Sequence, residues 1–151
     1  MCWIAIKEED RELHVATKDI KVKKVLEVDH YDGYCSPCYP MRWEKGRDYK
    51  THFVKYGNLC IDNGFHSCKE IHTIPTQTVG KNKRGYWVCT DYSKTRNYRK
   101  PMFHVRENHV LCDFVIPKGA RYYLNHYGEY VSDRIRFVGV SDETKEMKHE
   151  K

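Results

Sequence analysis

The stretch VLCDFVIPKGARYYL, residues 110–124, decides the fold of this chain. Every second residue from Val110 to Ile116 is Val, Cys, Phe or Ile, and a period of two is typical of a β-strand with a buried face. Pro117 ends this strand because proline has no backbone N–H to donate. Lys118-Gly119 then supplies a turn, so we expect a second strand at 121–124.

The same period of two recurs on both sides of this stretch. Apolar residues alternate along 20–28, with Lys24 in register among them. Asn63-Gly64 lies between two short apolar segments and predicts a type I′ hairpin. Further strands are expected at 2–7, 12–17, 86–92 and 134–140.

Helical patterns are weak in this sequence. No segment shows an apolar stripe at i, i+3, i+4 and i+7, which predicts a β-dominated α+β fold with one or two short helices. The expected architecture is a single domain built on a strongly bent antiparallel sheet or a partial barrel. A chain of 151 residues is long enough for one hydrophobic core. We expect that domain at 1–140, followed by a charged tail at 141–151 that is a frayed helix or disordered.

Apolar content and the N-terminal segment predict a protein without membrane spans. No window approaches ~18 consecutive apolar residues, and the opening MCWIAIKEEDRE becomes acidic without a signal-peptide segment. We therefore expect a cytoplasmic location, in the cell of origin or inside a host cell. The seven cysteines are then reduced thiols, most of them small buried side chains.

Positive charge is concentrated in one segment, KNKRGYWVCTDYSKTRNYRK at 81–100. It holds seven basic residues against Asp91 and so carries the whole net charge of +6. Cations neutralise phosphates, and interleaved rings can stack on bases. The segment predicts a site for a nucleotide, a nucleic acid or an acidic protein; the alternative is a solvated hairpin that protects a sheet edge. The candidate ligand-binding residues are Lys83, Arg84, Tyr86, Trp87, Lys94, Arg96 and Arg99.

The segment YCSPCYPMRW at 34–43 raises the question of metal binding. Zinc sites use a C-x2-C turn as half of a tetrahedral thiolate set, and Cys35 and Cys38 have this spacing. Cys60 and Cys68 are the available second pair, although they are too far apart for the tight second hairpin of a zinc ribbon. A redox pair would open a helix of a βαβ unit, which the sequence lacks. The favoured interpretation is a turn whose cysteines pack against aromatic rings, with no metal bound.

Motifs of known catalytic chemistry are missing from the sequence. It contains no Walker loop, no G-x-G-x-x-G, no G-x-S-x-G and no paired carboxylates. The nine histidines are scattered, without the spacing of a metal-binding helix. A binding protein without resident cofactor is therefore favoured over an enzyme.

Three segments resemble a loose family of small proteins of phages and of gut bacteria that carry prophages. They are RWEKGRDY at 42–49, CIDNGFHSCKE at 60–70 and FVIPKGARYYLNHYGEYVSDRIRF at 114–137. The shared pattern is a GFH-(A or S)-C box and an IPKG turn followed by E-Y-(V or A)-S-D-(K or R)-I. The resemblance implies a phage-type accessory protein that binds a host component or a small anionic ligand. The basic segment at 81–100 lies outside the shared pattern.

A more distant similarity links the C-terminal strands to ADP-ribosyltransferases. In those enzymes a glutamate at the start of a late strand binds a ribose of NAD, and Glu129 has that position after the IPKG turn. The resemblance implies Glu129 as catalytic acid, with Ser67 from a middle strand and His30 or Arg42 from an early one. An NAD-dependent enzyme is therefore the alternative function.

Overall fold

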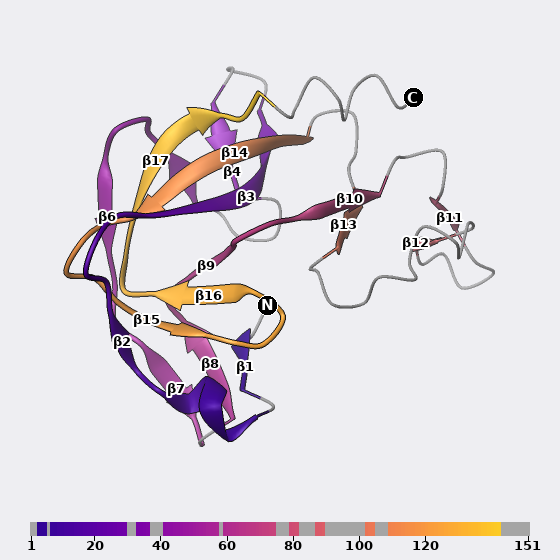
Figure 1. Cartoon of the computed structure of the whole chain (residues 1–151). Helices are drawn as coiled ribbons and strands as arrows, with labels where there is room; N and C mark the ends of the chain where they lie inside the picture. The colour runs from indigo at the N-terminus through magenta and orange to yellow at the C-terminus, as the bar shows by residue number, and fades with distance from the viewer. Residues whose placement is uncertain are drawn as a thin grey trace.

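The computed structural model describes residues 3–5, 7–29, 33–36, 41–57, 59–74, 79–81, 87–89, 102–104 and 109–142. Within 72–104 it describes the backbone alone. The described chain is mainly β-structure, and its longer strands curve strongly (Figure 1). The predicted β-dominated fold is therefore confirmed.

The N-terminal half contains short strands around one long strand. These are β1 (Trp3–Ile4), β2 (His14–Val15), β3 (Ile20–Val28), β4 (Tyr34–Cys35), β5 (Arg42–Trp43), β6 (Asp48–Lys50), β7 (Val54–Tyr56), β8 (Cys60–Asn63) and β9 (Phe65–Cys68). The remaining strands are β10 (His72–Ile74), β11 (Val79–Lys81), β12 (Trp87–Cys89), β13 (Met102–His104), β14 (His109–Ile116), β15 (Arg121–Leu124), β16 (Glu129–Ser132) and β17 (Arg134–Val140).

A ten-stranded sheet has the order β2-β15-β16-β9-β3-β14-β17-β6, with β4 paired to β3 and β5 paired to β4. All of its strand pairs are antiparallel. Strand β14 pairs with β3 along its whole length, from His109 opposite Glu27 to Ile116 opposite Ile20. The sheet is open at both ends of this order among the described strands, so the structure shows a bent sheet and no closed barrel.

Strands β15 and β16 separate two hydrophobic clusters. Tyr122 and Tyr130 contact the larger cluster, which also contains Trp43, Phe114 and other residues of β3, β14 and β17. The next residue on each strand faces the opposite way, and Tyr123 and Val131 belong to the smaller cluster around Trp3. Both faces of this hairpin are therefore buried.

The smaller cluster is covered by a three-stranded sheet of order β1-β8-β7. The prediction of a hairpin at Asn63-Gly64 is wrong, because β8 and β9, which flank these residues, belong to different sheets and do not pair with each other. Gly64 has φ +126°, and a Cβ at that position would lie 2.5 Å from Cγ2 of Val131. Glycine is needed there because the chain crosses between two sheets against the buried Val131.

The prediction of one or two short helices is also wrong for the described residues. They contain only the 3₁₀ turn η1 (Glu8–Arg11), and their apolar residues follow the period of strands. Nothing in the described ranges forms a helix with the length and apolar character of a membrane span. Of the tail predicted at 141–151, residues 143–151 lie outside the description.

Candidate functional site

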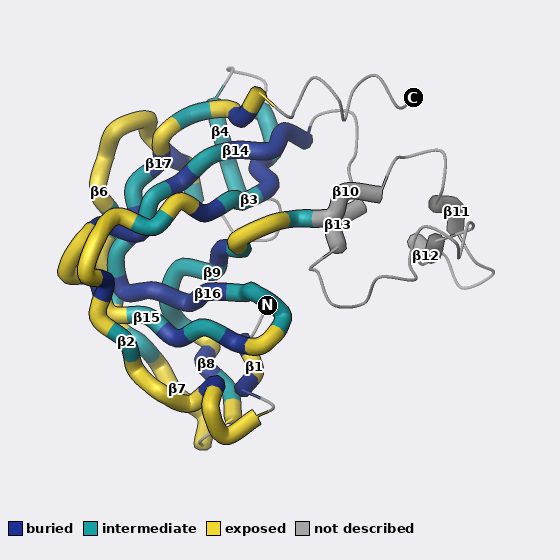
Figure 2. Tube along the Cα trace, viewed as in Figure 1, coloured by how far each residue is buried: buried dark blue, intermediate teal, exposed yellow. Residues whose placement is uncertain are grey.

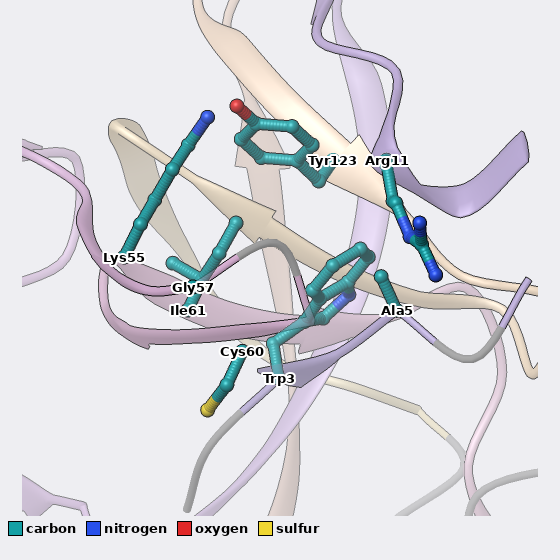
Figure 3. Close-up of a pocket in the computed structure, with 8 residues that line it drawn as sticks. All are labelled: Trp3, Ala5, Arg11, Lys55, Gly57, Cys60, Ile61 and Tyr123. Carbon is teal, nitrogen blue, oxygen red and sulfur yellow. The ribbon is translucent and has the colours of Figure 1, made fainter. Parts of the chain in front are cut away.

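A small pocket opens at the end of the three-stranded sheet, between β1, the β7–β8 connection and η1 (Figure 3). Its volume is about 80 Å³, which suits a single phosphate or carboxylate group with a few water molecules. Trp3, Ile61 and Tyr123 form its floor, and Arg11 and Lys55 stand at its rim. The pocket therefore combines an apolar floor with two cations.

The floor of the pocket is held firmly in place. Trp3 is 1% exposed, and its indole Nε1 donates a hydrogen bond of 2.9 Å to the main-chain oxygen of Glu129. The rings of Trp3 and Tyr123 lie 5.7 Å apart, and Phe53 packs edge-on against Tyr123. Because these rings are buried in the smaller cluster, the floor is fixed before any ligand arrives.

The rim of the pocket carries uncompensated positive charge. Nζ of Lys55 lies 5.0 Å from the centroid of the Tyr123 ring, and Arg11 stands on the other side of Trp3 (Figure 3). No lining residue is acidic. Within the described ranges, neither cation has a carboxylate within 4 Å. Each of the two cations can donate charge-assisted hydrogen bonds to an anion.

Arg11 is positioned by the residue before it. Asp10 is 5% exposed, and its Oδ2 lies 2.9 Å from Nδ1 of His126 in the β15–β16 turn. Burial opposes the charge of Asp10, but hydrogen bonds from His126 and from the main-chain N–H of Lys7 lower the pKa of its carboxyl below the ordinary value. The Asp10–His126 pair therefore fixes η1, and with it Arg11, against β15.

The predicted basic site lies almost wholly outside the described residues. Lys83, Arg84, Tyr86, Lys94, Arg96 and Arg99 are not described, and Trp87 is placed only through the backbone of β12. That strand pairs antiparallel with β11, so Lys81 lies opposite Trp87. The described pocket at Arg11 and Lys55 is lined by other residues, and the sequence did not predict it because they are scattered between positions 3 and 123.

The residues of the alternative catalytic site do not share one face. Glu129 lies opposite Cys68, whereas Ser67 lies opposite Tyr130; opposed residues share a face and neighbours alternate. Side chains of Glu129 and Ser67 therefore point to opposite sides of the sheet. The Glu129 carboxylate accepts a hydrogen bond of 3.4 Å from Nδ2 of Asn125.

Of the two early-strand candidates, the structure describes only Arg42. Arg42 is paired with Asp29 at 3.1 Å, and His30 lies outside the described residues. Ser67 is 3% exposed, and its Oγ has no hydrogen-bond partner in the described part of the chain. The geometry of the described residues thus gives the NAD-dependent alternative no catalytic constellation.

The cysteines do not gather into a metal site in the described ranges. No group of three or more His, Cys, Asp or Glu side chains there could hold a metal ion. The thiol of Cys35 donates to Oδ2 of Asp29 at 3.6 Å, and burial raises the pKa of Cys68 to about 12. Cys38 is not described, so the C-x2-C pair as such cannot be placed.

Lys24, which the sequence places in register with the apolar residues of 20–28, is a further charged residue inside the sheet. It alternates in phase with buried Val22 and Leu26, and its Nζ lies 5.5 Å from the ring centroid of Trp43 and 5.9 Å from that of Phe114. Burial lowers its pKa to about 8. The sequence indicates this position of Lys24 because the residue alternates in register with Val22 and Leu26.

No protein-family model matches this chain, and no curated protein or solved structure is significantly similar to it. The resemblances to phage-associated proteins and to ADP-ribosyltransferases therefore stay predictions.

Proposed function

We propose that this protein is a binding protein that recognises an anionic group through the pocket between Arg11 and Lys55. The observation that carries the proposal is the pair of cations, contributed by two separate elements, over a floor of buried rings with no acid among the lining residues. In a phage-type accessory protein, such a site would engage a small anionic ligand or an acidic host component.

Electrostatics and desolvation both support an anion in this pocket. The floor of Trp3, Ile61 and Tyr123 excludes water from one side, and a lower local dielectric strengthens attraction to nearby cations. Arg11 can bind a phosphate or carboxylate with two N–H donors, while Lys55 acts as a point charge. The small volume favours one charged group over an enclosed nucleotide.

Calorimetric titration with inorganic pyrophosphate at low ionic strength tests the proposal. Wild-type protein is expected to bind, and the Arg11→Gln/Lys55→Met variant should bind at least about tenfold more weakly because both donors are lost. Binding should also weaken with added salt, since both cations are exposed.

A matched control separates the pocket from overall charge. Lys21→Met/Lys118→Met removes two exposed cations elsewhere and gives the same net charge as the pocket variant. Its affinity for pyrophosphate should equal that of the wild type. Equal weakening in both variants, or no binding by the wild type, would rule out the pocket as an anion site.

A further inference from the structure

Arg11 owes its place at the rim of the pocket to one buried contact of a neighbouring side chain. The turn η1 that carries Arg11 has four residues, and only Asp10 among them is buried. Oδ2 of Asp10 lies 2.9 Å from Nδ1 of His126. A single 3₁₀ turn has few hydrogen bonds of its own, and their geometry is poorer than in an α-helix. The position of η1 therefore depends on this one side-chain contact.

Lys55, the other cation of the rim, is held in a different way. It belongs to β7, which pairs with β8 so that Lys55 lies opposite Ile61 of the pocket floor. Main-chain hydrogen bonds between paired strands fix such a residue whatever the neighbouring side chains are. The two cations therefore have separate supports, and only that of Arg11 passes through the side chain of His126.

The β15–β16 turn, residues 125–128, is itself tied to the strand that lines the pocket. The turn combines buried, half-buried and exposed positions (Figure 2), and Asn125 is 5% exposed. Its Oδ1 accepts hydrogen bonds of 3.0 Å from the main-chain N–H groups of Tyr127 and Glu129. Its Nδ2 donates one of 3.5 Å to the main-chain oxygen of Ile4 in β1. The turn thus has a fixed place relative to β1.

We infer that His126 is a positioning residue of the anion pocket, which sets Arg11 over the pocket floor through Asp10. Asn125 ties the turn to β1, and the next residue, His126, ties the same turn to η1. A guanidinium that is already in place loses less conformational freedom when an anion binds, so cutting the tie to η1 should weaken binding. The inference rests on the proposed function, because it explains how one of the two cations is held.

A double-mutant cycle, measured by calorimetric titration with inorganic pyrophosphate, tests the inference. His126→Ala should weaken binding about threefold to tenfold, which corresponds to the cost of ordering one long side chain. In the Arg11→Gln background the same change should have no further effect, because the side chain that His126 positions is gone. In the Lys55→Met background the full loss should persist. Equal losses in all three backgrounds, or no loss in the wild-type background, would overturn the inference.

His126→Asn separates the hydrogen bond from the charge of the imidazole ring. Asparagine keeps a short N–H donor for Asp10 but carries no charge, so the affinity for pyrophosphate should stay within about twofold of the wild type. His52→Ala changes an exposed histidine that does not line the pocket and should have no effect. Binding by His126→Asn that is as weak as that of His126→Ala would contradict the positioning role.

The other partner of the contact gives a second check, which needs no variant of His126. Asp10→Ala removes a negative charge one residue from Arg11, and by charge alone this would strengthen anion binding. The inference predicts the opposite, a loss of about threefold to tenfold. Glu9→Ala removes the same charge at an exposed position of η1 and should not weaken binding.

Equal affinities of Asp10→Ala and Glu9→Ala would refute the positioning role and leave the anion pocket standing. Failure of the proposed function gives a different result. Pyrophosphate then does not bind to the wild type, or it binds in a way that does not depend on Arg11 and Lys55.

Discussion

The side-chain amino group of Lys24 donates a hydrogen bond to the main-chain carbonyl of His66, which ties β3 to β9 inside the large sheet. Among the described residues, these two strands share one residue pair, Lys23 opposite Cys68. Burial and then the charge of Lys24 lower the pKa of the His66 imidazole to about 4. A buried ammonium group thus bridges a junction that only one described residue pair holds, next to a histidine that stays neutral at physiological pH.

Replacement of Lys24 by methionine should stabilise the protein and change its pH dependence. Folding lowers the pKa of Lys24 from 10.5 to about 8, so between these values the unfolded chain binds more protons at this residue and Lys24 contributes a rise of the free energy of unfolding with pH. Lys24→Met removes this rise and the burial of a charge, and should add about 1–3 kcal/mol at pH 7. Urea denaturation from pH 7 to 10.5 measures both effects.

Lys21→Met is the matched control on the same strand, because Lys21 is exposed. It should change the free energy of unfolding by less than about 0.5 kcal/mol at every pH. A Lys24→Met variant that is less stable than the wild type at pH 7 would mean that the hydrogen bond to His66 outweighs the cost of burying the charge.

Gly64→Ala should be strongly destabilising. The residue has φ +126°, and the new Cβ would lie 2.5 Å from Val131 and within 3.3 Å of the Phe53 ring; both backbone strain and overpacking oppose it. We expect a loss of about 2–4 kcal/mol in the free energy of unfolding. Gly46→Ala serves as control, since φ is +81° there but nothing lies within 4 Å of the new Cβ. Its cost should be only about 1 kcal/mol, and equal costs would show that the contact with Val131 does not matter.

Asp10→Asn should destabilise η1 in a manner that depends on pH. The pKa of Asp10 is lowered in the folded state, so its ionised form contributes stability above the ordinary value of 3.8, and this contribution is lost as pH falls through the folded pKa. Thermal denaturation should show a difference of about 1 kcal/mol from wild type at pH 6 that shrinks in acid. Glu9→Gln, at an exposed neighbouring position, should show no such difference. A pH-independent effect would indicate that the charge of Asp10 plays no part.

The basic segment at 81–100 provides a test of polyanion binding that is independent of the pocket. Reversal of Lys83, Arg84, Arg96 and Arg99 to glutamate should sharply lower the salt concentration that elutes the protein from heparin. With fewer cations in contact with the polyanion, binding releases fewer counterions and is weaker. Reversal of four exposed lysines elsewhere, Lys18, Lys21, Lys50 and Lys118, gives the same net charge. Equal elution of both variants would mean that the segment only contributes overall charge.

The strands around the IPKG turn were predictable because their signals are local. The second strand was expected at 121–124 and is β15 (Arg121–Leu124), and the strand expected at 134–140 is β17. Alternation of apolar residues predicts a strand, and Pro117 and Gly119 mark its end and the turn. Both signals lie within a few residues of the chain, so they do not depend on distant residues.

The role of Asn63-Gly64 could not be predicted in the same way. Two adjacent turn residues between apolar segments indicate a hairpin, and they do not tell whether the flanking strands pair with each other. Strand β8 pairs with β1 and β7, and β9 pairs with β16 and β3. Gly64 does mark a special position of the chain. The reason is that Val131 of the distant strand β16 lies against it, which leaves no room for a side chain.

The sequence by itself determined that this protein is built of strands, where several of them begin and end, and that Lys24 is in phase with the core. Only the tertiary structure brought Arg11 and Lys55 to the same pocket and put Glu129 and Ser67 on opposite faces of the sheet. The physical reason is that strand formation follows from the period of neighbouring side chains, whereas strand pairing joins residues far apart in the chain, and its register decides which side chains meet.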